Sequence, residues 1–167
     1  MLPPWPGWDG LHPLVIHFPV ALLLIAPVFL VLSAVVARHA TGFGLSALIL
    51  LAIGTAAAYV AVETGEAAAE LADRTEAITA AIMRHQALAD QALTIFTVIT
   101  LAYAVLLVLP RFVKRLASRG AQVTVALVVL GAVLGGAIQV AATAHQGGML
   151  VHKLGVHAML PPEPAAK

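Results

Sequence analysis

LHPLVIHFPVALLLIAPVFLVLSAVVA, residues 11–37, contains no Asp, Glu, Lys or Arg. A helix of about 20 apolar residues is long enough to cross the hydrocarbon layer of a bilayer. Three more apolar runs follow this one, so the expected spans are residues 14–37, 45–62, 92–109 and 123–144. Because a helix satisfies its own backbone hydrogen bonds in lipid, the sequence predicts an all-α fold, an integral membrane four-helix bundle.

The composition of the whole chain supports a membrane protein. Of its 167 residues, 61% are apolar and 10% are charged, whereas ordinary soluble domains are about 45–50% apolar. A net charge of +1 without a long basic run gives no reason to expect a nucleic acid partner. The absence of cysteine excludes disulfides, thiolate metal sites and covalently attached haem. We expect one four-span domain over residues 1–160 and a loose tail over residues 161–167.

The charges between the spans predict how the bundle is oriented. The connection between spans three and four, PRFVKRLASRG, has four basic residues and no acid, and the first connection adds Arg38. The second connection instead carries Glu63, Glu66, Glu70, Asp73 and Glu76. Since basic connections stay in the cytoplasm, both termini are expected on the outer side, with Trp5 and Trp8 at the interface. For a Gram-negative host this is the periplasmic side of the bacterial inner membrane.

Six of the seven histidines fall on the outer side in this topology, and only His39 falls on the inner side. The six are His12, His17, His85, His145, His152 and His157. Ionisable groups in or near a bilayer are costly and usually face the bundle interior. Imidazole is a good ligand for haem iron, copper and zinc, and helix bundles build cofactor sites from residues on several helices. His12, His17, His85 and His145 are therefore the candidate ligands, with His152 as a further one.

The expected cofactor is haem b, one or two per chain. Spans one and three are diagonal in an up-down bundle, so His17 and His85 are the expected axial pair. The second pair is His145 with either His12 or His152. Two imidazoles saturate haem iron, which favours electron transfer over oxygen chemistry.

Two further residues bear on that haem site. His12 and His17 are about 140° apart on a helix, so both face one site only if His12 lies in a loop. Pro13 is compatible with such a loop. Arg84, next to His85, is a candidate partner for a haem propionate.

Two other functions stay open at this point. The histidines, with Glu63, Glu66 or Asp90, suit copper, zinc or iron without porphyrin. Alternatively, the chain is a structural subunit of a larger membrane complex and its histidines only form hydrogen bonds. Nothing resembles a nucleophilic triad, a P-loop or a dinucleotide fingerprint, so an electron-transfer or subunit role is favoured over a stand-alone enzyme. A quinol in the bilayer and a periplasmic cytochrome or larger membrane redox complex are the expected partners.

Other residues are expected to serve the packing of the bundle. Gly131, Gly135 and Gln139 predict a stripe of close helix contact on span four. Thr94, Thr97 and Thr100 are expected to bond their own helix or a neighbouring one. Thr75 is a candidate N-cap for a third helix that begins well before its apolar part. We find no internal repeat in the sequence.

Three segments carry a resemblance to a known family. LHPLVIHFPVALL (residues 11–23), TGEAA (residues 64–68) and HQGGMLVHKLGV (residues 145–156) occur in that order, with His85 between the last two. Together they resemble the bacterial membrane family catalogued as domain of unknown function 2231. The resemblance implies a small four-helix membrane domain whose family histidines match His12, His17, His85 and His145. The family's closing pattern, HxGGxLVYxxG, commonly has tyrosine where His152 stands here, and His157 is additional.

Overall fold

The computed structural model describes residues 5–156, and this part of the chain is built from helices. Its α-helices are α1 (His12–Val15), α2 (His17–Val35), α3 (Ala40–Glu70), α4 (Glu76–Val108) and α5 (Arg119–His152). Short 3-10 turns occupy Trp8–Leu11, Ala37–His39, Leu109–Arg111 and Lys114–Ala117. Four helical segments in the described chain are long and apolar enough to cross a membrane. The predicted all-α fold with four spans is confirmed.

The helices are longer than the apolar runs that predicted them. α3, α4 and α5 contain 31, 33 and 34 residues, which corresponds to about 46–51 Å against a hydrocarbon layer of about 30 Å. As predicted, α4 begins early, and the Thr75 side chain caps it by accepting a hydrogen bond from Ile78 N at 3.3 Å. One end of the bundle therefore projects past the apolar runs. It contains α1, the end of α3, the start of α4 and the end of α5, and we call it the histidine end.

The first span is interrupted near the histidine end. Proline has no N–H, so Pro19 cannot donate a hydrogen bond to the carbonyl of Val15. Helix α1 ends at Val15, and α2 begins at His17 after a single intervening residue, Ile16. His12 consequently belongs to a separate helical turn.

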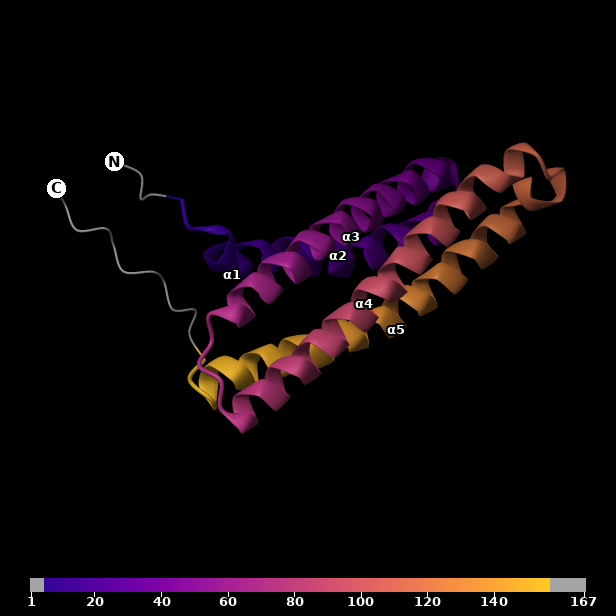
Figure 1. Cartoon of the computed structure of the whole chain (residues 1–167). Coiled ribbons are helices and arrows are strands. Elements are labelled where there is room, and N and C mark those ends of the chain that lie inside the picture. The colour runs from indigo at the N-terminus through magenta and orange to yellow at the C-terminus, as the bar shows by residue number, and fades with distance from the viewer. Residues whose placement is uncertain (1–4, 157–167) are drawn as a thin grey trace.

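The long helices form two hairpins, α2–α3 and α4–α5 (Figure 1). Helix α2 packs on α3 and α5, and α4 packs on the same two helices. Helices α2 and α4 are therefore diagonal, as are α3 and α5. The two hairpins have the same topology, with α2 corresponding to α4 and α3 to α5.

The two hairpins are structural repeats of each other. A shift of 73 residues (12 to 85) relates the first helices, and a shift of 82 residues (65 to 147) relates the second helices. Equivalent buried pairs are Leu23 and Phe96, Leu30 and Tyr103, Ala47 and Val129, and Leu51 and Val133. Because nearly every equivalent pair differs in identity, the repeat is not evident in the sequence. The correspondence therefore lies in how the helices pack, and the sequence itself shows no internal repeat.

Equivalent glycines hold each hairpin together. A Cβ atom on Gly54 would lie 2.9 Å from Leu23 Cδ2, and a Cβ atom on Gly136 would lie 2.9 Å from Phe96 Cζ. By contrast, a Cβ atom on Gly131 or Gly135 would meet nothing within 4 Å. The expected close contact on α5 therefore involves Gly136 instead of the Gly131 and Gly135 stripe.

These neighbouring glycines give a matched test of packing. Replacing Gly136 with Val should lower the free energy of unfolding by about 1–3 kcal/mol, because the new side chain overlaps Phe96. Gly135→Val makes the same chemical change one residue away in open space. Unfolding in mixed detergent micelles, followed by circular dichroism, compares the two. Equal losses of stability would contradict the assigned contact.

Candidate functional site

A cavity of about 680 Å³ lies between the two hairpins at the histidine end. Its volume is within the range of about 300–1,000 Å³ that is typical of small-molecule and cofactor sites. Most of the wall is apolar and comes from α1 to α5, with Leu23 and Phe96 among its residues. The side chains on the wall that can ionise or hydrogen-bond are Asp9, His12, Glu66, His85, Gln86, Asp90, Thr143 and His152.

His12 is held by helix α3. Its Nδ1 lies 2.9 Å from the carbonyl oxygen of Ala61 and 3.5 Å from Oγ1 of Thr64. The ring rests on Gly65, where a Cβ atom would approach His12 Cε1 to 2.9 Å. The absence of a side chain at Gly65 therefore makes room for the imidazole against the helix.

His85 is held by helix α5 in the same way. Its Nδ1 lies 3.0 Å from the carbonyl oxygen of Thr143, and a Cβ atom on Gly147 would approach His85 Cε1 to 3.1 Å. Ala61 and Thr143 are equivalent in the two repeats, and so are Gly65 and Gly147. The cavity thus has two histidines in equivalent places on diagonal elements.

The hydrogen bonds fix which ring nitrogen carries the proton. A carbonyl oxygen only accepts hydrogen bonds, so Nδ1 of His12 and Nδ1 of His85 are both protonated donors. In each neutral ring the lone pair is then on Nε2, which has no hydrogen-bond partner within residues 5–156. Histidines that ligate metals almost always donate their other N–H in this way. Both imidazoles are in the tautomer that a metal ligand needs.

Comparison with known proteins identifies the family of this chain. The pattern of a family described as a predicted membrane protein, domain of unknown function 2231, matches residues 9–159. The chain belongs to this family. No curated protein and no solved structure matches the chain.

The opening segment of this member of the domain of unknown function 2231 family contains two histidines. One of them lines the cavity and the other lies on the surface. His12 lines the cavity, whereas His17 is exposed and is not part of the wall. The two side chains point in different directions because residues five apart are about 140° apart on a helix, and Ile16 between them keeps helical dihedral angles (φ −57°, ψ −26°). The loop expected around His12 is not present, because His12 is the first residue of α1, and of the two histidines only His12 faces the cavity.

The closing segment contributes mainly through Gly147. His145 is exposed and does not line the cavity, and His152 is exposed at its edge. His39 lies in the 3-10 turn at the opposite end of the bundle. His157 is outside the described residues. The structure therefore brings His12, His85 and His152 to the cavity, and leaves His17 and His145 outside it.

The charged candidates are distributed unevenly. Arg84 is exposed and does not line the cavity, nor does Glu63, whereas Glu66 and Asp90 do. Within the described part of the chain, no group of three or more His, Asp or Glu side chains is placed to hold a metal ion.

Asp9 is a part of the site that the sequence did not indicate. Its Oδ2 atom is buried in the cavity wall and has no hydrogen-bond partner among residues 5–156. Buried polar atoms are nearly always satisfied, so this oxygen needs a proton or a group within the cavity as its partner. Gly65 was also missed as a functional residue. Its position in the TGEAA segment was the available signal, since Gly147 of the HQGG segment has the same role in the other hairpin.

Proposed function

We propose that this protein is a membrane b-type cytochrome that holds one haem between His12 and His85. The observation that supports it is the pair of equivalent imidazoles on one cavity, each with Nδ1 bound to a helix carbonyl and Nε2 free. Both rings line the same cavity and come from diagonal elements of the bundle. The axial pair in this proposal is His12 with His85, in place of His17 with His85.

The number and kind of ligands favour haem over a bare metal. Copper, zinc and non-haem iron sites usually take at least three protein ligands. No such group was found among the described residues. Porphyrin supplies four nitrogen ligands of its own, so two imidazoles complete the coordination of its iron. Because His145 does not line the cavity, the proposal is for one haem and not two.

The residues around the pair define what the protein contributes. When bound, haem supplies a one-electron carrier whose potential depends on its ligands and its surroundings. The carbonyls of Ala61 and Thr143 orient the two rings and make them more basic. Leu23 and Phe96 keep the wall apolar. No Lys or Arg among residues 5–156 is part of the wall, so acidic groups of the cofactor would have to reach water.

The partners follow from the proposed orientation. Basic residues at the opposite end of the bundle favour a cytoplasmic position for that end, and the histidine end would then face the periplasm of a bacterial inner membrane. Electrons would pass from a quinol, or from a membrane redox complex, to a periplasmic acceptor. Glu63, Glu66 and Glu70 are exposed at this end, and they would favour an acceptor with a basic surface.

The visible spectrum of detergent-purified protein is the direct test. We expect a Soret band, sharp α and β bands after dithionite reduction, and about one haem b per chain in a pyridine haemochrome assay. Elemental analysis of the same sample should find iron in the same ratio. Protein that folds in haem-replete cells without a Soret band would overturn the proposal. Stoichiometric copper or zinc in that protein would then favour a metal site.

A further inference from the structure

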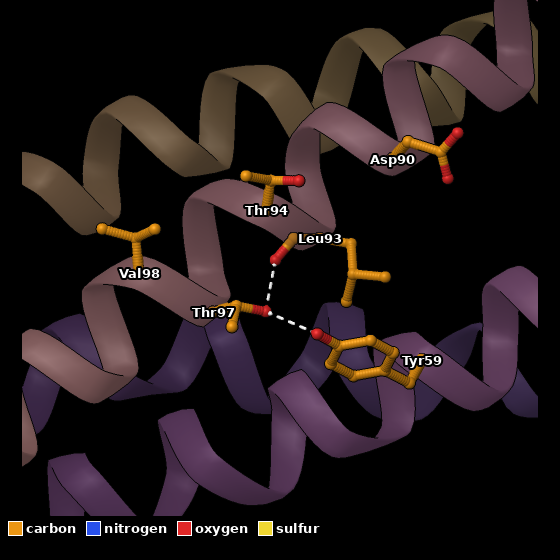
Figure 2. Close-up of a pocket in the computed structure, with 6 residues that line it drawn as sticks. All are labelled: Tyr59, Asp90, Leu93, Thr94, Thr97 and Val98. Atoms are coloured by element: carbon orange, nitrogen blue, oxygen red, sulfur yellow. Dashed lines mark hydrogen bonds between the residues drawn. The ribbon is translucent and has the colours of Figure 1, made fainter.

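A second hollow, of about 420 Å³, lies on the outside of the bundle between α3 and α4. Figure 2 shows its lining, which consists of Tyr59, Asp90, Leu93, Thr94, Thr97 and Val98. Tyr59 is 49% exposed and Val98 is 61% exposed, so the hollow opens outward. Asp90 and Leu93 also line the histidine cavity. We call this hollow the α3/α4 groove, and it shares a wall with the cavity.

The hydrogen bonds in the α3/α4 groove leave acceptors and a donor free. Thr97 Oγ1 donates its proton to the carbonyl oxygen of Leu93 at 2.8 Å. The 3.3 Å contact between Thr97 and Tyr59 must then be a donation from the Tyr59 hydroxyl, as drawn in Figure 2. The Tyr59 hydroxyl accepts no hydrogen bond from residues 5–156, and Tyr59 lines the groove. The groove can therefore accept hydrogen bonds at Tyr59 and at the Asp90 carboxylate.

Thr94 is the donor without a partner. Thr97 and Thr124 bond carbonyls of their own helices, which is the usual solution for threonine in a membrane helix. The Thr94 hydroxyl makes no hydrogen bond to any residue from 5 to 156, so the expectation for this residue was wrong. A hydroxyl without a partner is unfavourable away from water. Its placement beside Asp90 indicates a ligand with oxygen atoms.

The depth of the α3/α4 groove matches an amphiphile dissolved in the bilayer. The apolar run of the second span ends at residue 62, and that of the third begins at residue 92. Tyr59 and Asp90 lie beside these two limits, and the groove continues along Thr94 and Val98 into the apolar part. Tyrosine is common at this level of a membrane. A ring carrying hydroxyl groups can bind here while its apolar tail stays in lipid.

The internal repeat shows that packing alone does not require these polar groups. The equivalent groove lies between α5 and α2. There, the residues equivalent to Tyr59, Asp90, Thr94 and Thr97 are Ala141, His17, Ala21 and Leu24. Two structurally equivalent interfaces thus differ in their hydroxyl and carboxylate groups. The polar set on one of them is a specialisation of the α3/α4 groove.

We infer that the α3/α4 groove binds the head group of a lipid-soluble quinol or quinone. A quinol hydroxyl donates to the Asp90 carboxylate or to the Tyr59 oxygen, and a quinone carbonyl accepts from Thr94. Leu93 and Val98 provide apolar contact for the ring. The inference rests on the proposed cytochrome function for its purpose, since it places an electron donor beside the haem cavity. The binding itself does not depend on haem.

Photolabelling with a short-chain azidoquinone tests the site in the full-length protein in lipid nanodiscs. We expect the label on peptides containing Tyr59 or residues 90–98, and competition by unlabelled decylquinone. Label confined to other helices, or no saturable label, would overturn the inference. Competition by excess phospholipid but not by decylquinone would show a lipid site and would also overturn it. The haem spectrum of the same sample tests the cytochrome proposal separately.

Matched variants sharpen this test. Asp90→Leu, which removes the acceptor oxygens, should weaken quinol binding about fivefold, and Thr94→Val should weaken quinone binding by the same factor, the effect of losing one hydrogen bond. Thr94→Ser keeps the hydroxyl and should restore binding. Ala21→Val places the same side chain at the equivalent position of the other groove, and it should leave binding unchanged. Equal effects of Thr94→Val and Ala21→Val would contradict the assignment.

Discussion

Replacing His12 or His85 with Ala is expected to remove the low-spin haem spectrum, leaving less than about a tenth of the wild-type low-spin haem per chain. Each change takes away one of the two imidazoles on the cavity wall, so the proposed iron loses one axial ligand. The remaining imidazole cannot compensate, because its Nδ1 is held by a carbonyl of its own hairpin. Reduced-minus-oxidised spectra at equal protein concentration measure the effect.

Three other histidines serve as controls. His17→Ala, His39→Ala and His145→Ala remove imidazoles that do not line the cavity, so each variant should keep its α and β bands. Size-exclusion chromatography must show that every variant remains folded. If His17→Ala abolished the spectrum while His12→Ala preserved it, the axial pair would be His17 with His85. If all five variants kept the spectrum, the cavity would not be the haem site.

Much of the fold followed from elementary membrane physics. Apolar runs of about 20 residues predicted the four helices, and the Thr75 cap predicted the early start of α4. The ends of the helices were harder to predict from the sequence. Polar residues can continue a helix beyond the bilayer, and the apolar pattern does not mark where such a helix ends. Thus the prediction ended the second span at residue 62, whereas α3 continues to Glu70.

The site could be predicted only in part. Histidine spacing identified the histidine end, but it could not choose between His12 and His17, because the two lie about 140° apart on a helix and the sequence does not show which of the two directions faces the cavity. The hydrogen-bond partners of the two imidazole rings could not be predicted from the sequence either. His12 and His85 bind backbone carbonyls, and any residue type has a carbonyl. Ala61 and Thr143 therefore carry no side-chain signal of their role.

The internal repeat explains why the sequence concealed the symmetry of the site. Buried positions in the hairpins select for combined volume and not for identity, so Leu23 can stand where the other repeat has Phe96. The choice of residue type is more restricted at the positions that hold a histidine against a helix. Both repeats have histidine on the first helical element and glycine on the second, at His12 with Gly65 and at His85 with Gly147. Contact between an imidazole ring and a helix backbone leaves little choice of side chain at the contacted position, whereas many combinations of side chains can fill the same core volume.

Gly65→Val and Gly147→Val should therefore each weaken haem binding about 10–100-fold although both ligands are still present. The added side chain would occupy the place of His12 Cε1 or His85 Cε1, which lie 2.9 and 3.1 Å from the respective Cβ positions. The ring must then leave its carbonyl, and Nε2 loses its direction toward the cavity. Haem titration of the purified apoprotein, followed at the Soret band, measures the affinity.

Gly135→Val is the control for this prediction, because it adds the same side chain to an exposed residue of α5 that does not line the cavity, where a Cβ atom would meet nothing within 4 Å. Its haem affinity should stay within about twofold of the wild type, since a surface change away from special features has little effect. If Gly135→Val and Gly147→Val weakened haem binding equally, the loss would come from the β-branched residue in the helix and not from the displaced ring. A loss at Gly147 without one at Gly65 would show that only His85 depends on its glycine, and the two imidazoles would not be equivalent ligands.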